Sequence, residues 1–297
     1  MRANYRFKLS YQIYFEVSRF RHVYRARFHP GEKHGEARPQ VLVVSPYSPA
    51  PAVHGGAVRM LNLIREMNEK CDVTLISFTD TPAESSPESL AELQAICRDV
   101  VLLPRDLHSY GGRLLPIAMH GFFSERMFEM IEIWLEKRAF DVVQIEYTNM
   151  AHYLPPPCPG MLRVLVEHDV SFVAAERARQ NETSRLRRAA LWVDGLRTLR
   201  HEVRSVEQAD RILTMSENDR ETLARFVDPE PISVVPNGVS CRDFPYAPEE
   251  AEPATILFVG FFRHPPNVEA VLHFAQEVLP RIRAEVPDAI FRVVGAY

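Results

Sequence analysis

Buried strands and amphipathic helices alternate along the chain from residue 40 onward. Val41–Val44 is a run of four aliphatic residues without polar alternation, which is typical of a strand buried on both faces of a parallel sheet. After it, Met60, Leu61, Ile64 and Met67 recur at the spacing of one helix face. Similar apolar runs predict six further strands before residue 240, at 72–78, 100–103, 140–146, 162–167, 211–215 and 232–235.

Signals for helix starts stand between these strands. Ser86 and Pro87 are typical of an N-cap and a first helical position, and Ser216 precedes acidic residues that suit a helix N-terminus. Further helices are predicted from about 124 to 139 and, as one long helix, from about 171 to 208. Because strands and helices alternate with short connections, the pattern predicts an α/β fold with a doubly wound parallel sheet.

The pattern restarts after a connector rich in proline and glutamate. It predicts strands at 255–259 and 289–294, with a helix beginning near Pro266. We therefore divide the chain into an N-terminal extension, 1–38, a first Rossmann-like domain, 39–240, a linker, 241–253, and the start of a second Rossmann-like domain, 254–297. One strand-helix-strand unit cannot bury a two-sided sheet, so the second domain is either truncated or completed by something else. We expect truncation, with this chain a fragment.

Composition places the chain among ordinary globular proteins rather than fibrous or disordered ones. It has 297 residues, a net charge of -4 and 46% hydrophobic residues. Its four cysteines are far apart and form no C-x-x-C pair, which fits a reducing compartment and indicates no zinc site. No apolar run approaches the ~18 residues of a membrane-spanning helix. We therefore expect a cytoplasmic protein.

Basic charge is concentrated in two segments. Residues 1–40 contain nine Arg and Lys against three Glu, interleaved with Tyr and Phe. This segment could lie peripherally on the anionic inner face of a membrane. The alternatives are a flexible extension or an artefact of a wrongly assigned translation start site. The segment 177–204 contains eight arginines and three acidic residues. This second segment is either a solvated helix surface or a positive face that attracts an anionic acceptor or lipid headgroups.

Gly55 and Gly56 follow the first strand and a proline-rich turn, where the next helix begins. Glycine allows positive φ and leaves backbone N–H groups accessible. Together with the helix dipole, these amides suit a phosphate or another oxyanion, although the pair could instead only close a tight turn. Neither G-x-G-x-x-G nor G-x-x-x-x-G-K-[ST] is present, so the sequence carries neither a dinucleotide fingerprint nor a P-loop.

Polar residues gather where the predicted strands end. Because ligands of doubly wound sheets bind at the carboxyl ends of the strands, we expect these residues to line a cleft. His168 stands between two acidic residues at a strand end, which favours a site role, whereas the alternative is a core histidine satisfied by a backbone carbonyl. The candidates are Gly55, Gly56, Glu146, Tyr147, His168, Asp169, Ser216, Asn237 and Gly238.

Six motifs in order resemble the family 4 retaining glycosyltransferases of the GT-B fold. They are the proline and glycine stretch 46–64, D-V-V-Q-I-E-Y at 141–147, E-H-D-V at 167–170, 201–216, V-V-P-N-G-V at 234–239 and F-V-G-F-F-R-H-P-P-N-V-E-A at 258–270. The resemblance covers about residues 40–297. It implies two Rossmann-like domains, with the acceptor on the first and a nucleotide-sugar donor on the second.

The resemblance also implies roles for individual residues. Gly55 and Gly56 match the glycine loop that lies against the donor diphosphate or sugar, and His168 matches the histidine that contacts the donor sugar. The turn 236–238 matches the interdomain crossover. Many members carry a glycine-arginine and a nearby lysine after the next strand. Here Gly260 is followed by two phenylalanines, Arg263 and no lysine, so the sequence departs from the pattern and Arg263 is only a candidate substitute for these phosphate ligands.

The implied reaction is sugar transfer with retention, to a glycan or lipid-linked acceptor, without a metal or other cofactor. No carboxylate is placed as a nucleophile, so we expect a front-face mechanism in which the leaving phosphate assists the incoming hydroxyl, and preorganised amide donors stabilise that phosphate. The family's paired glutamates match nothing in this sequence, so we expect the fragment alone to be inactive. A nucleotide-sugar 2-epimerase of the same fold and a non-catalytic binding module are the alternatives, and no nucleic-acid partner is expected.

Overall fold

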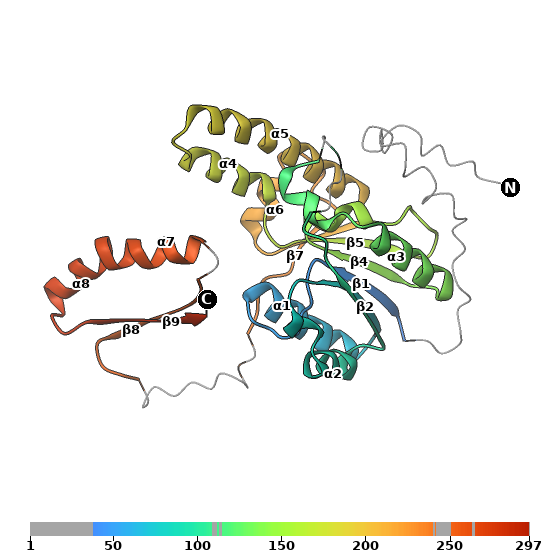
Figure 1. Ribbon diagram of the computed structural model, residues 1–297, viewed down its shortest axis with the longest axis horizontal. Helices are drawn as coiled ribbons and strands as arrows, with labels where there is room; N and C mark the ends of the chain where they lie inside the picture. The colour runs from blue at the N-terminus through green and yellow to red at the C-terminus, as the bar shows by residue number, and fades with distance from the viewer. Residues whose placement is uncertain are drawn as a thin grey trace. The chain divides into compact units, whose positions relative to one another are not determined.

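The computed structural model describes residues 38–108, 112, 115–239, 241, 251–262 and 265–296 (Figure 1). These residues form two compact units, the first ending at Asn237 and the second beginning at Gly238. The basic N-terminal extension up to residue 37, Arg263 and most of the predicted linker lie outside the described residues.

The first unit is built on a seven-stranded sheet whose strands are all parallel. The spatial order is β3-β2-β1-β4-β5-β6-β7, so the order reverses between β1 and β4. This reversal is the topological switch point, where α/β sheets bind ligands. The seven predicted strands are confirmed, as β1 (Gln40–Ser45), β2 (Asp72–Thr79), β3 (Asp99–Pro104), β4 (Val142–Glu146), β5 (Leu162–Glu167), β6 (Arg211–Thr214) and β7 (Ile232–Val234).

Helices cover both faces of this sheet. Its strands read as continuous apolar runs because alternate side chains enter two separate cores. Val41 and Val43 pack with α1 and α2, whereas Leu42 and Val44 pack with α3 on the other face. The helices are α1 (Gly55–Asn68), η2 (Pro82–Ser85), α2 (Pro87–Ile96), η3 (Ile117–Phe122), α3 (Glu125–Lys137), η4 (Thr148–Tyr153), α4 (Ser171–Asn181), α5 (Arg185–Gln208) and α6 (Glu217–Leu223).

The segment predicted as one long helix is two helices, α4 and α5. The backbone leaves the helical conformation at Glu182, the C-cap of α4, and Ser184 then caps α5 by accepting a hydrogen bond from the backbone N–H of Arg187. The prediction of an unbroken helix was wrong because the break contains neither glycine nor proline. A serine N-cap is the signal that could have placed it.

The glycine pair forms the first turn of α1 rather than a loop before it. His54 is the N-cap, and its Nδ1 accepts a hydrogen bond from the backbone N–H of Ala57. Neither Gly55 nor Gly56 has a positive φ, so the pair does not use the left-handed region that glycine allows. Ser86 and Ser216 cap α2 and α6 as predicted.

The second unit is one strand-helix-strand motif. The strands β8 (Thr255–Phe261) and β9 (Ile290–Ala296) pair in parallel, and the chain between them forms α7 (Pro265–His273), a π-helical turn η6 (Phe274–Val278) and α8 (Leu279–Glu285). Leu257 and Val259 on β8 remain 60% and 69% exposed, so within the described residues this unit leaves much of its apolar surface uncovered. None of the helices described in either unit is long and apolar enough to cross a bilayer.

Candidate functional site

The switch point brings the carboxyl ends of β1 and β4 together. Val44 of β1 pairs with Ile145 of β4, so the chain leaves the two strands at neighbouring positions. Tyr47 lies in the turn after β1 and Tyr147 directly follows β4, and their hydroxyl groups are hydrogen-bonded to each other. Tyr47 and Tyr147, which are 100 positions apart in the sequence, therefore lie side by side in the candidate site.

Glu146 and His168 form a buried pair between β4 and β5. Nε2 of His168 lies 2.6 Å from Oε2 of Glu146, and their side chains are only 6% and 5% exposed. The second carboxylate oxygen of Glu146 accepts a hydrogen bond of 2.5 Å from Nε2 of Gln144. The carboxylate thus holds the imidazole at one nitrogen, which leaves Nδ1 as the atom that can meet a ligand.

Tyr147 is held in a strained conformation. Its φ of 72° and ψ of 143° lie in a region that glycine adopts readily and other residues rarely do. The backbone N–H of Tyr147 donates to the carbonyl of Val166, and its ring is stacked on His168 with centroids 3.7 Å apart. Burial raises the pKa of the Tyr147 hydroxyl to about 12. Such strain of about 1–3 kcal/mol persists where surrounding contacts fix the backbone, as they do at functional sites.

Gly56 lies directly beneath the tyrosine pair. A Cβ atom at this position would clash with the hydroxyl oxygens of both Tyr47 and Tyr147, whereas one at Gly55 would meet nothing within 4 Å. An alanine at position 56 would therefore require these two hydroxyl ends to shift, whereas one at position 55 would not. The N-terminus of α1, with its positive dipole end, lies at the same edge of the sheet as these two hydroxyls.

Arg59 of α1 binds the chain that leaves β7. Its guanidinium donates to the carbonyl oxygens of Val235 and Pro236, at 2.8 and 2.9 Å, and to Oδ1 of Asn237 at 3.0 Å. Arg59 is only 8% exposed although it carries a charge. It fixes the proline-asparagine end of the predicted crossover turn, and Gly238 already belongs to the second unit.

Two further carboxylates are buried behind His168. Thr148 donates its hydroxyl hydrogen bond to Glu167, which is 1% exposed, and its oxygen also lies 3.4 Å from Glu202, which is fully buried. Glu202 accepts the backbone N–H groups of Ser171 and Phe172 at the start of α4. Burial raises the pKa of Glu202 to about 7 and raises that of Glu167 as well, with each carboxylate opposing the other's charge.

Two of the predicted site residues, Ser216 and Asp169, do not belong to the cluster that Tyr47, Gly56, Glu146, Tyr147 and His168 form. Ser216 uses its hydroxyl to cap α6, donating to Asp219 at 2.6 Å, so the structure assigns it a helix-capping contact. Asp169 is exposed, and its charge contributes to the raised pKa of both Tyr47 and Tyr147, which places it beside the site. Arg263 lies outside the described residues.

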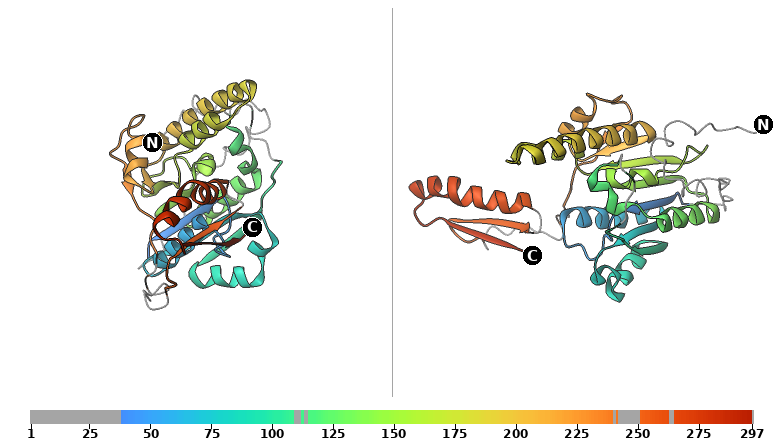
Figure 2. Two further views of the ribbon diagram at one scale, coloured as in Figure 1. Left: turned by 90° about the vertical axis from the view of Figure 1, so that its left-hand side faces the viewer. Right: turned by 45° about the horizontal axis from the view of Figure 1, so that its top comes forward.

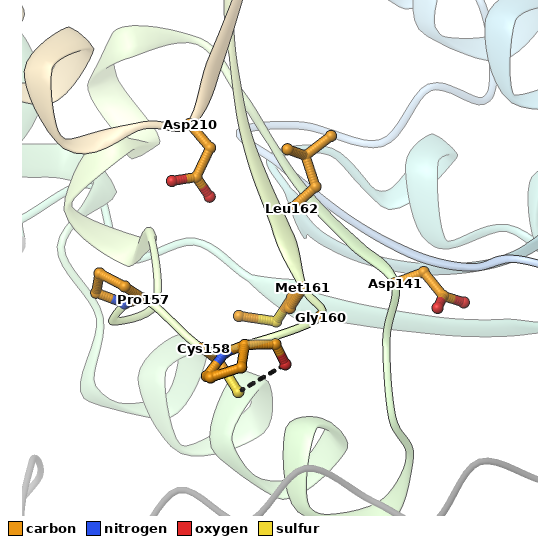
Figure 3. A pocket seen from close by; sticks show the side chains of 8 residues that line it. Asp141, Pro157, Cys158, Gly160, Met161, Leu162 and Asp210 are labelled. Atoms are coloured by element: carbon orange, nitrogen blue, oxygen red, sulfur yellow. Dashed lines mark hydrogen bonds between the residues drawn. The ribbon is translucent and has the colours of Figure 1, made fainter. Parts of the chain in front are cut away.

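A hollow of about 540 Å³ lies at the opposite edge of the sheet, at the amino ends of β4, β5 and β6 (Figure 3). Asp141 and Asp210 line it together with the proline-rich loop before β5. Their carboxylates have structural partners, because Asp141 accepts the backbone N–H of Gln40 and Asp210 pairs with Arg163 at 2.7 Å. We therefore do not assign the ligand site to this hollow.

Sequence reasoning missed two residues of the cluster, Tyr47 and Arg59. Tyr47 stands among prolines and reads as part of a turn, and Arg59 occupies one position of an otherwise ordinary amphipathic helix. Tyr47 could have been found from its place directly after a buried strand at the switch point. Among the described residues no group of His, Cys, Asp and Glu could hold a metal ion.

One protein-family model matches most of the first unit. The family model for Glycosyltransferase Family 4 matches residues 53–243, which is more than half of the chain. No curated protein sequence is significantly similar to the chain.

Solved structures share the fold at low sequence identity. Sucrose-phosphate synthase from Thermosynechococcus elongatus is 16% identical, with a TM-score of 0.56, and the alignment covers 88% of this chain and 71% of that protein. A UDP-glucosyltransferase from Polygonum tinctorium is 12% identical, with a TM-score of 0.42, over 76% of this chain and 59% of that protein. The similarity to the synthase confirms the predicted α/β, Rossmann-like fold, which is shared with GT-B glycosyltransferases.

Proposed function

Because the chain belongs to glycosyltransferase family 4, we propose that it takes part in transfer of a sugar from a nucleotide-diphosphate sugar, with retention, to a glycan or lipid-linked acceptor. The observation that carries the proposal is the cluster at the switch point. There, Gly56 at the start of α1 lies against the tyrosine pair, and Tyr147 lies against His168. We assign the departing diphosphate to the glycine end of this cluster and the reacting sugar to His168.

The proposed chemistry needs no metal or cofactor. The bond between the anomeric carbon and the diphosphate oxygen breaks, and the acceptor oxygen bonds to that carbon on the same face. The departing phosphate oxygen takes the proton of the acceptor hydroxyl. Amide donors and the positive end of α1 would stabilise the charge that develops on the phosphate, which lowers the barrier.

His168 would position the donor sugar. With Nε2 held by Glu146, Nδ1 is the ring atom left to accept a hydrogen bond from a sugar hydroxyl. The stacked Tyr147 ring covers one face of the imidazole and fixes its plane. A group fixed in this way binds the reacting sugar without losing rotational freedom at that moment, which favours the transition state.

The test is ligand-observed NMR on the 297-residue chain with uridine, guanosine and adenosine diphosphate sugars. We expect millimolar affinity or weaker and no measurable turnover, because the donor nucleotide is assigned to the second unit, whose apolar surface is largely exposed. Saturation transfer to the sugar protons should be lost in His168→Ala. Equal NMR saturation transfer in the wild type and in His168→Ala would overturn the assignment of the sugar to this cluster.

The products distinguish the competing functions. In any enzyme preparation that transfers sugar, retention requires that the transferred sugar in the initial product has the same anomeric configuration as in the donor. The opposite anomer would refute retention, and a nucleotide sugar epimerised at C2 would indicate the epimerase instead.

A further inference from the structure

Helices α4 and α5 form an arm that projects from the first unit. No residue of α4 is buried, and the buried residues of α5 begin only at Thr198. Figure 1 and both views of Figure 2 show the pair extending past the sheet of this unit. The outer part of the arm is therefore supported mainly by contacts between its own two helices, with a hydrogen bond that Asp194 accepts from the backbone N–H of Ile117.

An apolar stripe runs along the outer part of α5. Leu186, Trp192, Val193 and Leu196 are 86%, 56%, 42% and 49% exposed. With Ala189 they follow the spacings of three and four residues that place side chains on one helix face. Contiguous apolar surface of this kind marks an interaction site, whereas scattered apolar residues do not.

The stripe faces away from the partners of α5 within the first unit. Gly195 approaches Ala175 of α4 on one side, and Asp194 accepts the backbone N–H of Ile117 on another. Val193 and Leu196, which flank these two residues in sequence, remain 42% and 49% exposed. The arm's internal packing thus leaves the stripe uncovered.

Arginines border the stripe. Arg185, Arg197 and Arg200 fall within the same arc of the helix, three or four residues from members of the stripe. From Ser171 to Arg200 the arm holds seven arginines, three acidic residues and no lysine. Of the acids, Glu176 already pairs with Arg179 at 2.6 Å. The surface around the stripe is therefore positive.

We propose that this stripe is a docking surface for an anionic lipid bilayer. Leucine, valine and tryptophan enter the boundary between headgroups and acyl chains, while arginines reach lipid phosphates from the same helix face. An apolar stripe alone would fit many proteins, but the arginines select a negatively charged occupant. The interface is independent of the site at the switch point, and it would bring the enzyme to a surface that holds lipid-linked acceptors.

Vesicle co-sedimentation of the full 297-residue chain tests the proposal. The wild type should bind vesicles with 30% phosphatidylglycerol in phosphatidylcholine at least about tenfold more tightly than neutral vesicles, and less tightly as salt rises. The double variant Trp192→Ser, Leu196→Ser and the triple variant Arg185→Gln, Arg197→Gln, Arg200→Gln should each lose about tenfold or more. Circular dichroism should show that both variants keep their helices.

A matched control comes from α3, where Arg126 and Ile133 are exposed. The variant Arg126→Gln, Ile133→Ser should bind vesicles like the wild type, and the N-terminal extension is unchanged in every protein compared. In a Trp134→Phe background, Trp192 is the sole tryptophan, and its emission should shift to shorter wavelength with anionic vesicles only. The proposal would be overturned if the double and triple variants bound vesicles as tightly as the wild type does. It would also be overturned if the wild type bound no vesicles and the variants instead lost the ability to form a dimer.

Discussion

The imidazole of His168 lies flat against the phenol ring of Tyr147, with centroids 3.7 Å apart and planes 3° from parallel. The contact joins the ends of β4 and β5 and places a buried histidine beside a strained backbone. Because Glu146 holds the same imidazole at Nε2, the ring has a defined plane and a defined free edge. This geometry makes the role of His168 testable apart from its role in folding.

We predict that His168→Ala lowers turnover about 10- to 1000-fold in a preparation that transfers sugar, because a hydrogen bond to the reacting sugar is made mainly in the transition state. It also leaves Glu146 with one donor fewer, which should cost about 1–3 kcal/mol in the free energy of unfolding. His168→Gln can keep a donor toward Glu146, so it should recover much of the stability but not the turnover. Full activity in folded His168→Ala would make this residue purely structural.

The glycine pair allows a matched comparison. Gly56→Ala places a methyl group against the hydroxyls of Tyr47 and Tyr147 and should cost about 1–3 kcal/mol, whereas Gly55→Ala meets nothing and should be neutral or slightly stabilising. Thermal unfolding of both variants measures the difference. Replacing both tyrosines by phenylalanine in the Gly56→Ala protein should restore part of the loss. Equal melting temperatures for the two alanine variants would contradict the close packing.

The sequence predicts the framework of this site better than its contacts. Runs such as Val41–Val44 identify buried strands because neither face of the sheet is solvated, and strand ends then locate Tyr147 and His168. Tyr47 and Arg59 escape this reasoning because their partners lie about 100 and 180 residues away, so only the strand order and register bring them together. The break between α4 and α5 depends on one serine cap, a weak local signal.

The buried carboxylates predict a pH dependence of stability. Burial raises the pKa of Glu202 to about 7 and that of Glu167 well above its usual range, so the folded state keeps protons that the unfolded chain releases near pH 4.5. This contribution is therefore full below about pH 4.5 and is lost as the pH rises through about 7. Glu167→Gln keeps a neutral group of similar shape whose amide oxygen can accept the hydrogen bond from Thr148. It should reduce the loss of stability between pH 5 and 8.5.

Unfolding midpoints across that pH range measure the effect, with the exposed Glu207→Gln as control. The buried His201 acts in the opposite direction, because burial lowers its pKa to about 4 and its contribution is lost as the pH falls below about 6.5. His201 is unchanged in both variants, so the difference between the curves reports on the buried pair Glu167 and Glu202. Parallel curves for wild type and Glu167→Gln would show that this carboxylate is ionised throughout.

Arg59 offers the last prediction, because it is a buried cation that bonds only to uncharged oxygens in the contacts described. Arg59→Met keeps the apolar stem but removes the donors to Val235, Pro236 and Asn237, so three acceptors lose their partner. We expect a loss of about 2–4 kcal/mol and faster amide hydrogen exchange in residues 232–238. Arg59→Lys should not restore the wild type, since an ammonium group cannot reproduce the planar fork of donors.

The control on the same helix is Arg65→Met. Arg65 is about half exposed and pairs with Glu92 at 3.4 Å, a surface ion pair that contributes 1 kcal/mol or less. Its loss should leave exchange at 232–238 unchanged. If Arg59→Met and Arg65→Met gave the same exchange rates, α1 would not hold the end of β7. A selective increase in Arg59→Met would identify this arginine as the residue that fixes the chain where it leaves the first unit.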